Sequence, residues 1–255
     1  MRALRLMSFN LRRDVDADGP NRWAPRREVV ARLVERLAPH VLGTQEGLPH
    51  QLADLDARLP RYRRVGMCRD GDGAGEHVAI FYDASRLILV AWGDLWLSDA
   101  PNLPGSRSWG NRLPRMVTWA RFTDQETGRS FTCANTHLDH ESGASRERSA
   151  RFLAERFPDA VVMGDLNDAP DTRTWSLLLD GRRDALDGVP GGTFHGFRGE
   201  RGDRIDGILV PQAWTVAAAR VVDERVDGRL PSDHYPVVAD VAPAPLVRVA
   251  TAPDV

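Results

Sequence analysis

Six short polar clusters stand at the ends of apolar, strand-like segments of this chain. They supply carboxylates, carboxamides and imidazoles, which are the ligands of a hard divalent cation and the acid and base groups of hydrolytic chemistry. Because strands pack in the core while their ends meet at a rim, we expect the six clusters to gather at one place. They occupy residues 7–10, 43–46, 135–140, 162–167, 204–208 and 232–236.

The segments that must position these clusters alternate between strand-like and helix-like patterns. We expect strands at residues 3–10, 40–46, 78–82, 87–97, 116–122, 130–136, 160–163, 205–210, 214–222 and 237–241. We expect helices from Pro25 to about residue 37 and at residues 48–59, 144–157 and 172–179. Thr127-Gly128 marks a hairpin turn, and hairpins mixed with crossover helices predict mixed sheets covered by helices.

Two long segments, 66–76 and 98–114, carry no strand or helix pattern. Long loops in compact domains are commonly functional or disordered. Segment 98–114 is rich in proline and glycine and is flanked by polar motifs, so we expect it to help set substrate specificity. The Ala/Pro/Val-rich residues 242–255 are expected to form a loose C-terminal tail.

Composition excludes several classes of protein. Acidic and basic residues nearly cancel, with a formal net charge of −2, so no strong electrostatic footprint for nucleic acid is visible. No apolar run approaches the roughly 20 residues that span a bilayer. The N-terminus lacks the pattern of a signal peptide, which predicts a cytoplasmic protein. Two cysteines in a chain of 255 residues fit reduced, packed thiols better than a disulfide.

The six clusters, in this order, resemble those of the endonuclease/exonuclease/phosphatase superfamily, which includes DNase I, abasic-site endonucleases and inositol-phosphate phosphatases. The resemblance runs from Ser8 to about Asp240 and is similar in detail to a small bacterial branch, whose further motifs begin here at Gly75, Trp96 and Pro114, with a fourth at residue 192. It implies an α/β (α+β) fold, the DNase I-like four-layer sandwich of two mixed β-sheets with helices outside, in one domain over residues 1–255.

The resemblance also implies a metal site. Glu46 corresponds to the main Mg²⁺ ligand, with Asn10 and Asp233 as supporting groups, and Mn²⁺ is expected to substitute for Mg²⁺. Each residue also has an ordinary structural reading: a glutamate or asparagine after a strand is more often a turn residue. The presence of all six clusters favours the metal site.

The catalytic groups follow from the same resemblance. Asp165 and Asn167 correspond to residues that orient or deprotonate the attacking water and hold the phosphate. His137 corresponds to the histidine that contacts the scissile phosphate and protonates the leaving group. Asp206 and His234 resemble a carboxylate–imidazole pair in which the carboxylate fixes the tautomer and raises the basicity of the ring. Whether Asp165 or the Asp206–His234 pair is the general base stays open.

A second set of residues is expected to contact the substrate. Glu76 and Arg115 lie in the branch-specific motifs, although Arg115 could equally be a structural ion-pair partner. His140 and His195 are expected to line the pocket. The predicted substrate is a phosphate mono- or diester of a small molecule, hydrolysed by in-line attack of water by a monomeric enzyme.

Three alternatives remain. A nuclease would need basic or aromatic loops that track a nucleic-acid backbone, and the sequence offers only scattered arginines. A catalytically inactive binding module with the same fold is disfavoured because every expected catalytic position is filled. A membrane-acting phospholipase or sphingomyelinase is disfavoured by the missing export signal and the missing apolar hairpin.

Overall fold

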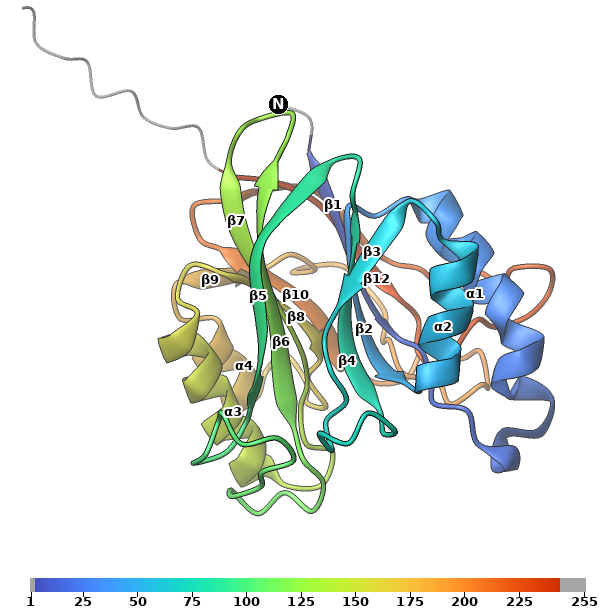
Figure 1. Cartoon of the computed structure of the whole chain (residues 1–255), viewed down its shortest axis with the longest axis horizontal. Helices are drawn as coiled ribbons and strands as arrows, with labels where there is room; N and C mark the ends of the chain where they lie inside the picture. Colours follow the sequence, from blue (N-terminus) through green and yellow to red (C-terminus); the bar gives the residue numbers. More distant parts are fainter. Residues whose placement is uncertain (1–2, 244–255) are drawn as a thin grey trace, which may run out of the picture.

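The computed structural model describes residues 3–243 and contains two six-stranded sheets packed face to face (Figure 1). The first sheet has the strand order β11-β12-β1-β2-β4-β3. Its strands are β1 (Leu4–Asn10), β2 (Val41–Gly47), β3 (Tyr62–Val65), β4 (His77–Asp83), β11 (Thr215–Val221) and β12 (Val237–Ala242). Only β1 and β2 run parallel among its pairs, so the sheet is mixed.

The second sheet has the order β5-β6-β7-β8-β10-β9, with β7 and β8 as its parallel pair. Its strands are β5 (Leu87–Trp96), β6 (Met116–Asp124), β7 (Ser130–His137), β8 (Val161–Asp165), β9 (Arg182–Asp184) and β10 (Asp206–Pro211). A hairpin at the expected Thr127-Gly128 turn joins β6 to β7. Both sheets are therefore mixed, as the sequence pattern predicts.

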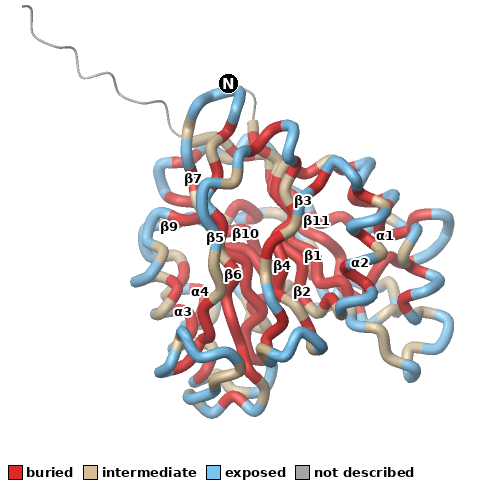
Figure 2. The backbone as a smooth tube through the Cα atoms, in the orientation of Figure 1, coloured by how far each residue is buried: buried red, intermediate tan, exposed pale blue. Residues whose placement is uncertain are grey.

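Helices cover the outer face of each sheet, which makes four layers (Figure 1). Helices α1 (Trp23–Leu37) and α2 (Pro49–Arg58) bury apolar side chains against the first sheet. Helices α3 (Gly143–Arg156) and α4 (Arg173–Leu178) do the same against the second sheet. The interior between the sheets is a third apolar cluster to which strands of both sheets contribute, and Figure 2 shows this buried centre with exposed helix surfaces outside it.

The element boundaries differ from the predicted ones in a few places. Helix α1 begins at Trp23, two residues before Pro25. A 3₁₀ segment at Asp16–Asn21 and the short strands β3 and β9 have no counterpart in the prediction. The expected tail begins inside β12, which extends to Ala242, and residues 244–255 lie outside the described part of the chain. Among residues 3–243, no helix is long and apolar enough to cross a membrane.

The strand directions explain why the polar clusters meet. The parallel pairs β1–β2 and β7–β8 end at the same edge of the sandwich, and the antiparallel strands β10 and β12 begin there. Asn10 and His137 are the last residues of β1 and β7, and Asp165 is the last residue of β8. Asp206, the first residue of β10, pairs directly with Asp165. The fold thus brings residues as far apart in the chain as Asn10 and Ser232, which are separated by 222 positions, to one edge.

Candidate active site

A cavity of about 550 Å³ opens at this edge, a volume typical of small-molecule sites. Most of the predicted site residues line it. These are Glu46, Glu76, Arg115, His137, His140, Asp165, Asn167, Asp233 and His234. Asn10 and Asp206 support them from beneath through hydrogen bonds, whereas His195 does not line the cavity.

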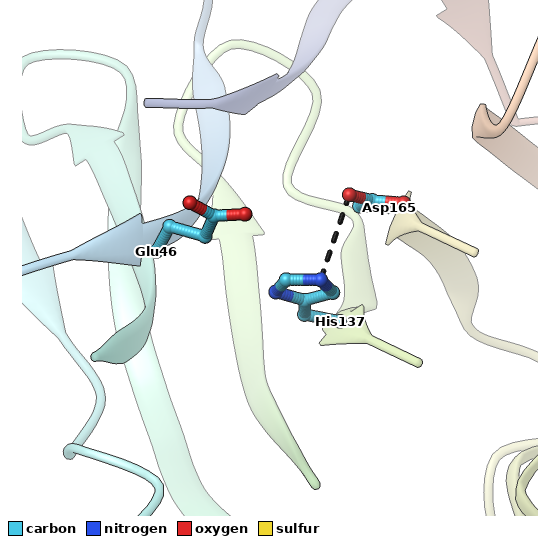
Figure 3. Close-up of side chains that lie close together, drawn as sticks. All are labelled: Glu46, His137 and Asp165. Carbon is cyan, nitrogen blue, oxygen red and sulfur yellow. Dashed lines mark ion pairs between the residues drawn. The ribbon is translucent and has the colours of Figure 1, made fainter. Parts of the chain in front are cut away.

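Glu46 is aimed at the cavity by an irregularity near the end of β2. The register between β2 and β4 shifts after Thr44, and Glu46 adopts a left-handed backbone conformation with φ of 62°. Such a conformation is strained for a residue with a side chain, and β-bulges commonly re-aim a side chain beside a functional site. Figure 3 shows the carboxylate of Glu46 turned toward His137 and Asp165.

The amide of Asn10 holds two carboxylates together. Its Nδ2 donates to Oε1 of Glu46 at 3.0 Å and to Oδ2 of Asp165 at 2.9 Å. Its Oδ1 accepts a hydrogen bond from the backbone N–H of Arg12 at 2.9 Å. In this orientation Asn10 positions the carboxylates as a donor, and its role as an oxygen ligand stays a prediction that requires the amide to turn over.

Asp165, Asp206 and His234 form a buried charged group. Nδ1 of His234 lies 2.9 Å from Oδ2 of Asp206, and its Nε2 lies 3.8 Å from Oδ2 of Asp165. Burial lowers the pKa of His234, but Asp206 and Asp165 outweigh it and raise the net pKa, so the ring is protonated at neutral pH. Burial and the charge of Asp206 raise the pKa of Asp165. This places Asp165 in the range where a carboxylate can accept a proton.

His137 differs from His234 in its charge. It lies at the end of β7, and its Nε2 is 3.5 Å from Oδ2 of Asp165 (Figure 3). Burial, followed by the positive charges of Arg115 and Arg69, holds the pKa of His137 well below its usual range. A neutral ring donates one N–H hydrogen bond but is a poor acid. The structure thus gives the two histidines different chemistry.

The turn after β8 fixes Asn167 beside Asp165. The backbone N–H of Asn167 donates to Oδ1 of Asp165 at 3.0 Å, and its Nδ2 donates to the carbonyl of Leu138 at 3.0 Å. Asn167 also has a left-handed backbone, with φ of 50°. Gly164, one residue before Asp165, has φ of 152°, and a Cβ there would lie 1.9 Å from the carbonyl oxygen of Thr136. Only glycine therefore allows β8 to approach β7 at this point.

A polar layer beneath the site joins the two sheets. Nδ2 of Asn135 donates to the carbonyls of Thr44 and Ala79, both at 2.9 Å. Its Oδ1 accepts from Nε2 of Gln45 at 2.7 Å. A Cβ at Gly43 would lie 2.7 Å from this Oδ1, so glycine makes room for the asparagine. Asn135 and Gln45 thus lock the strands that carry His137 and Glu46.

The expected substrate-contacting residues have different placements. Arg115 is buried, and its Nη2 donates to Nδ1 of His140 at 2.7 Å. Glu76 is an ion-pair partner of Arg69, with oxygens 2.7 and 2.9 Å from the guanidinium. His195 packs on the ring of Tyr235, with centroids 4.1 Å apart, away from the cavity. The expectation that His195 lines the pocket is therefore incorrect, because its ring is buried against Tyr235.

Two comparisons place this chain among known proteins. It matches the Endonuclease/Exonuclease/phosphatase family over residues 7–234. The chain belongs to this family. Comparison with curated proteins found no match.

Solved structures of other proteins resemble the chain over nearly its whole length. A Bacteroides thetaiotaomicron mannosyl-6-phosphatase is 31% identical over 94% of this chain and 100% of its own, with a TM-score of 0.88. A Bacteroides vulgatus endonuclease/exonuclease/phosphatase is 30% identical over 95% and 99%, with a TM-score of 0.90. D. rerio TDP2, solved with a single-strand DNA product, is 19% identical over 94% and 98% and shares the fold, with a TM-score of 0.74.

Family membership makes the chain a hydrolase that acts on ester bonds, in a family of phosphatases, phosphodiesterases and nucleases. Enzymes of this family generally depend on a divalent metal, and the residues present fit one. Ligand atoms of Glu46, His137 and Asp165 lie within 4.8 Å of one another. Glu46 and Asp165, which share the neutral amide of Asn10 as a donor, offer carboxylate oxygens, and these are the ligands that a hard cation prefers.

Some residues of the cavity have no counterpart in the sequence prediction. Asp18, Phe194, Phe197 and four arginines also line it; the arginines are Arg12, Arg13, Arg69 and Arg112. Nε of Arg12 lies 3.6 Å from a carboxylate oxygen of Asp233. Arg12 could have been found from its place two residues after Asn10, and Arg69 from its place on the long loop 66–76.

Proposed function

We propose that this protein is a Mg²⁺-dependent phosphoesterase that hydrolyses a small-molecule phosphate ester by in-line attack of water. The observation that carries the proposal is the buried group of Glu46, Asp165 and His234 at the base of a cavity sized for a small molecule. Glu46 would hold the cation, with Asn10 and Asp233 beside it. Bound there, Mg²⁺ supplies Lewis-acid stabilisation of charge on the phosphoryl oxygens, and Mn²⁺ is expected to substitute.

The other side chains of the cavity have separate roles in the proposed reaction. Asp165 accepts a proton from the attacking water, because burial and the charge of Asp206 raise the pKa of its carboxyl group. The protonated His234, held by Asp206, stabilises negative charge as it develops on the phosphoryl group. The neutral His137 and the second amide hydrogen of Asn167 donate to phosphoryl oxygens. As the water oxygen bonds to phosphorus, the bond from phosphorus to the ester oxygen breaks, and the leaving oxygen takes up a proton from bulk water. This assignment favours Asp165 over the Asp206–His234 pair as the general base.

Cavity shape and relatives support a small substrate over nucleic acid. The cavity has a volume of about 550 Å³, which fits a small ester, and we expect the enzyme to act as a monomer. A relative that is 31% identical is a mannosyl-6-phosphatase, which makes sugar phosphates the first compounds to test. The likeness to TDP2 concerns the fold alone, so a nuclease is the alternative outcome of the same assay.

The test is a substrate panel with purified protein in Mg²⁺ or Mn²⁺, with EDTA controls. The panel contains sugar phosphates, nucleotides, p-nitrophenyl phosphate, bis-p-nitrophenyl phosphate, and single- and double-stranded DNA. His234→Ala is compared with His50→Ala, which changes an exposed histidine outside the cavity. Metal-dependent turnover of a small ester that is lost only in His234→Ala supports the proposal. Turnover of DNA alone overturns the substrate class, and metal-independent turnover overturns the cofactor.

A further inference from the structure

Two buried arginines next to the proposed catalytic groups keep N–H groups without partners. Arg69 and Arg115 are 8% and 2% exposed, and both line the cavity. Nε of Arg69 and Nη1 of Arg115 have no hydrogen-bond partner among residues 3–243. A buried guanidinium N–H that lacks an acceptor is costly, and buried polar groups are otherwise almost always satisfied. Such a pair indicates a place where an anion binds.

The two arginines are not equally neutralised by the protein. Arg69 is paired with Glu76, which also accepts from Nη1 of Arg13 at 3.2 Å. Arg115 has a carboxylate partner only at 3.5 Å, in Asp139. Burial and then the positive charge of Arg69 lower the pKa of Arg115. The negative charge of an anion beside Arg115 would oppose both effects and stabilise its protonated form.

The position of the pair shows which part of a substrate it meets. Arg69 and Arg115 share one recess with Glu46 and His137. An acceptor at the arginines is therefore on the same group that His137 contacts, which under the proposed function is the scissile phosphoryl group. The recess, which Met116 also lines, has no room for a water molecule, so a substrate oxygen would meet the arginines from the main cavity, which both also line. An ester's second alcohol could not extend into the recess behind them.

We propose that Arg69 and Arg115 bind the third non-bridging oxygen of a phosphate monoester and thereby select monoesters over diesters. The proposal rests on the proposed function. A monoester dianion offers three non-bridging oxygens and about two negative charges, whereas a diester offers two oxygens and one charge. Charge-assisted hydrogen bonds from arginine to phosphate are among the strong ones, so the third oxygen carries the selectivity. Glu76 acts as a positioning residue for Arg69.

The test compares two substrates that share a leaving group, p-nitrophenyl phosphate and methyl p-nitrophenyl phosphate. For Arg115→Gln we expect kcat/KM for the monoester to fall on the order of 10²-fold and that for the diester to fall less than about 5-fold. Arg115→Lys is expected to restore part of the loss, since it returns charge without the planar fork. Arg121→Gln, an exposed arginine outside the cavity, is the matched control.

A binding measurement separates recognition from turnover. Calorimetric titration with inorganic phosphate in EDTA is expected to show about 10-fold weaker binding to Arg115→Gln than to the intact protein or to Arg121→Gln. If Arg115→Gln does not fold, Arg69→Gln is measured in the same two assays with the same expectation. Equal losses for both esters, or unchanged phosphate affinity, overturn the monoester proposal and leave the proposed function standing. Turnover of neither ester by the intact protein refutes the proposed function itself.

Discussion

The polar layer between the sheets gives a sharp prediction about stability. Asn135→Ala removes three buried hydrogen bonds, two to the carbonyls of Thr44 and Ala79 and one from Gln45. Each neutral hydrogen bond contributes about 1 kcal/mol, so the bonds alone account for about 3 kcal/mol. The amide of Gln45 and the two carbonyls then lose a partner in the interior, which adds to the cost. We expect the free energy of unfolding to fall by about 3–5 kcal/mol.

Urea unfolding followed by circular dichroism measures the change. With a slope of about 3 kcal/mol per molar urea, the midpoint falls by about 1 M or more. Thr132→Val on the same strand is the control, because it keeps a β-branched residue at a partly exposed position and is expected to change stability by less than about 0.5 kcal/mol. Asn135→Asp is expected to be at least as damaging as Asn135→Ala, since a carboxylate would face two carbonyls. A loss below about 1 kcal/mol for Asn135→Ala would show that this layer does not hold the sheets together.

Three further outcomes are expected. Saturating Mg²⁺ should raise the melting temperature of the intact protein but not that of Glu46→Gln. A cation at 100 times its Kd stabilises the native state by about 2.7 kcal/mol. An equal rise in both proteins would exclude Glu46 as a ligand. Gly164→Ala should lower the free energy of unfolding by about 3 kcal/mol or more, since its Cβ would collide with the backbone of Thr136. Gly228→Ala is the control, and because there is open space around it, it should cost about 1 kcal/mol. Similar unfolding midpoints in urea for the two variants would refute this reasoning. Burial lowers the pKa of His195 to about 4, so the unfolded chain takes up a proton that the folded chain resists, and stability is lost as the pH falls. Between about pH 7.5 and about pH 5 in EDTA, the free energy of unfolding of the intact protein should therefore fall by about 2 kcal/mol more than that of His195→Gln. Parallel pH profiles for the two proteins would contradict this prediction.

Sequence patterns predicted the sheets and the gathering of the site because the physical signals are local. Apolar strand-like runs that end in Asn10, His137 and Asp165 mark the carboxyl ends of the parallel strands. The alternation of apolar and polar residues did not predict β3 and β9, because strands of three or four residues have too few alternating positions to be recognised. Both are edge strands whose pairing depends on the rest of the sheet.

Side-chain direction was harder to predict than position. His195 and His140 are both histidines near polar motifs, yet only His140 lines the cavity. The difference arises from tertiary packing, since Tyr235 stacks on the ring of His195. Asn10 has the predicted neighbours, but its amide is turned so that nitrogen rather than oxygen faces the carboxylates. The sequence was therefore enough to predict which residues lie together, but not which of their atoms face one another.

The charges of the cavity explain why cation and substrate should bind together. On one side, Glu46 and Asp165 are close enough to share a single amide donor. On the other side, Arg115 lies beside Arg69 with little compensation from the protein. A divalent cation alone would leave the arginines unsatisfied, and an anion alone would face the carboxylates. A phosphate dianion with a divalent cation compensates both sides at once, so the binding of each should strengthen that of the other by the same factor.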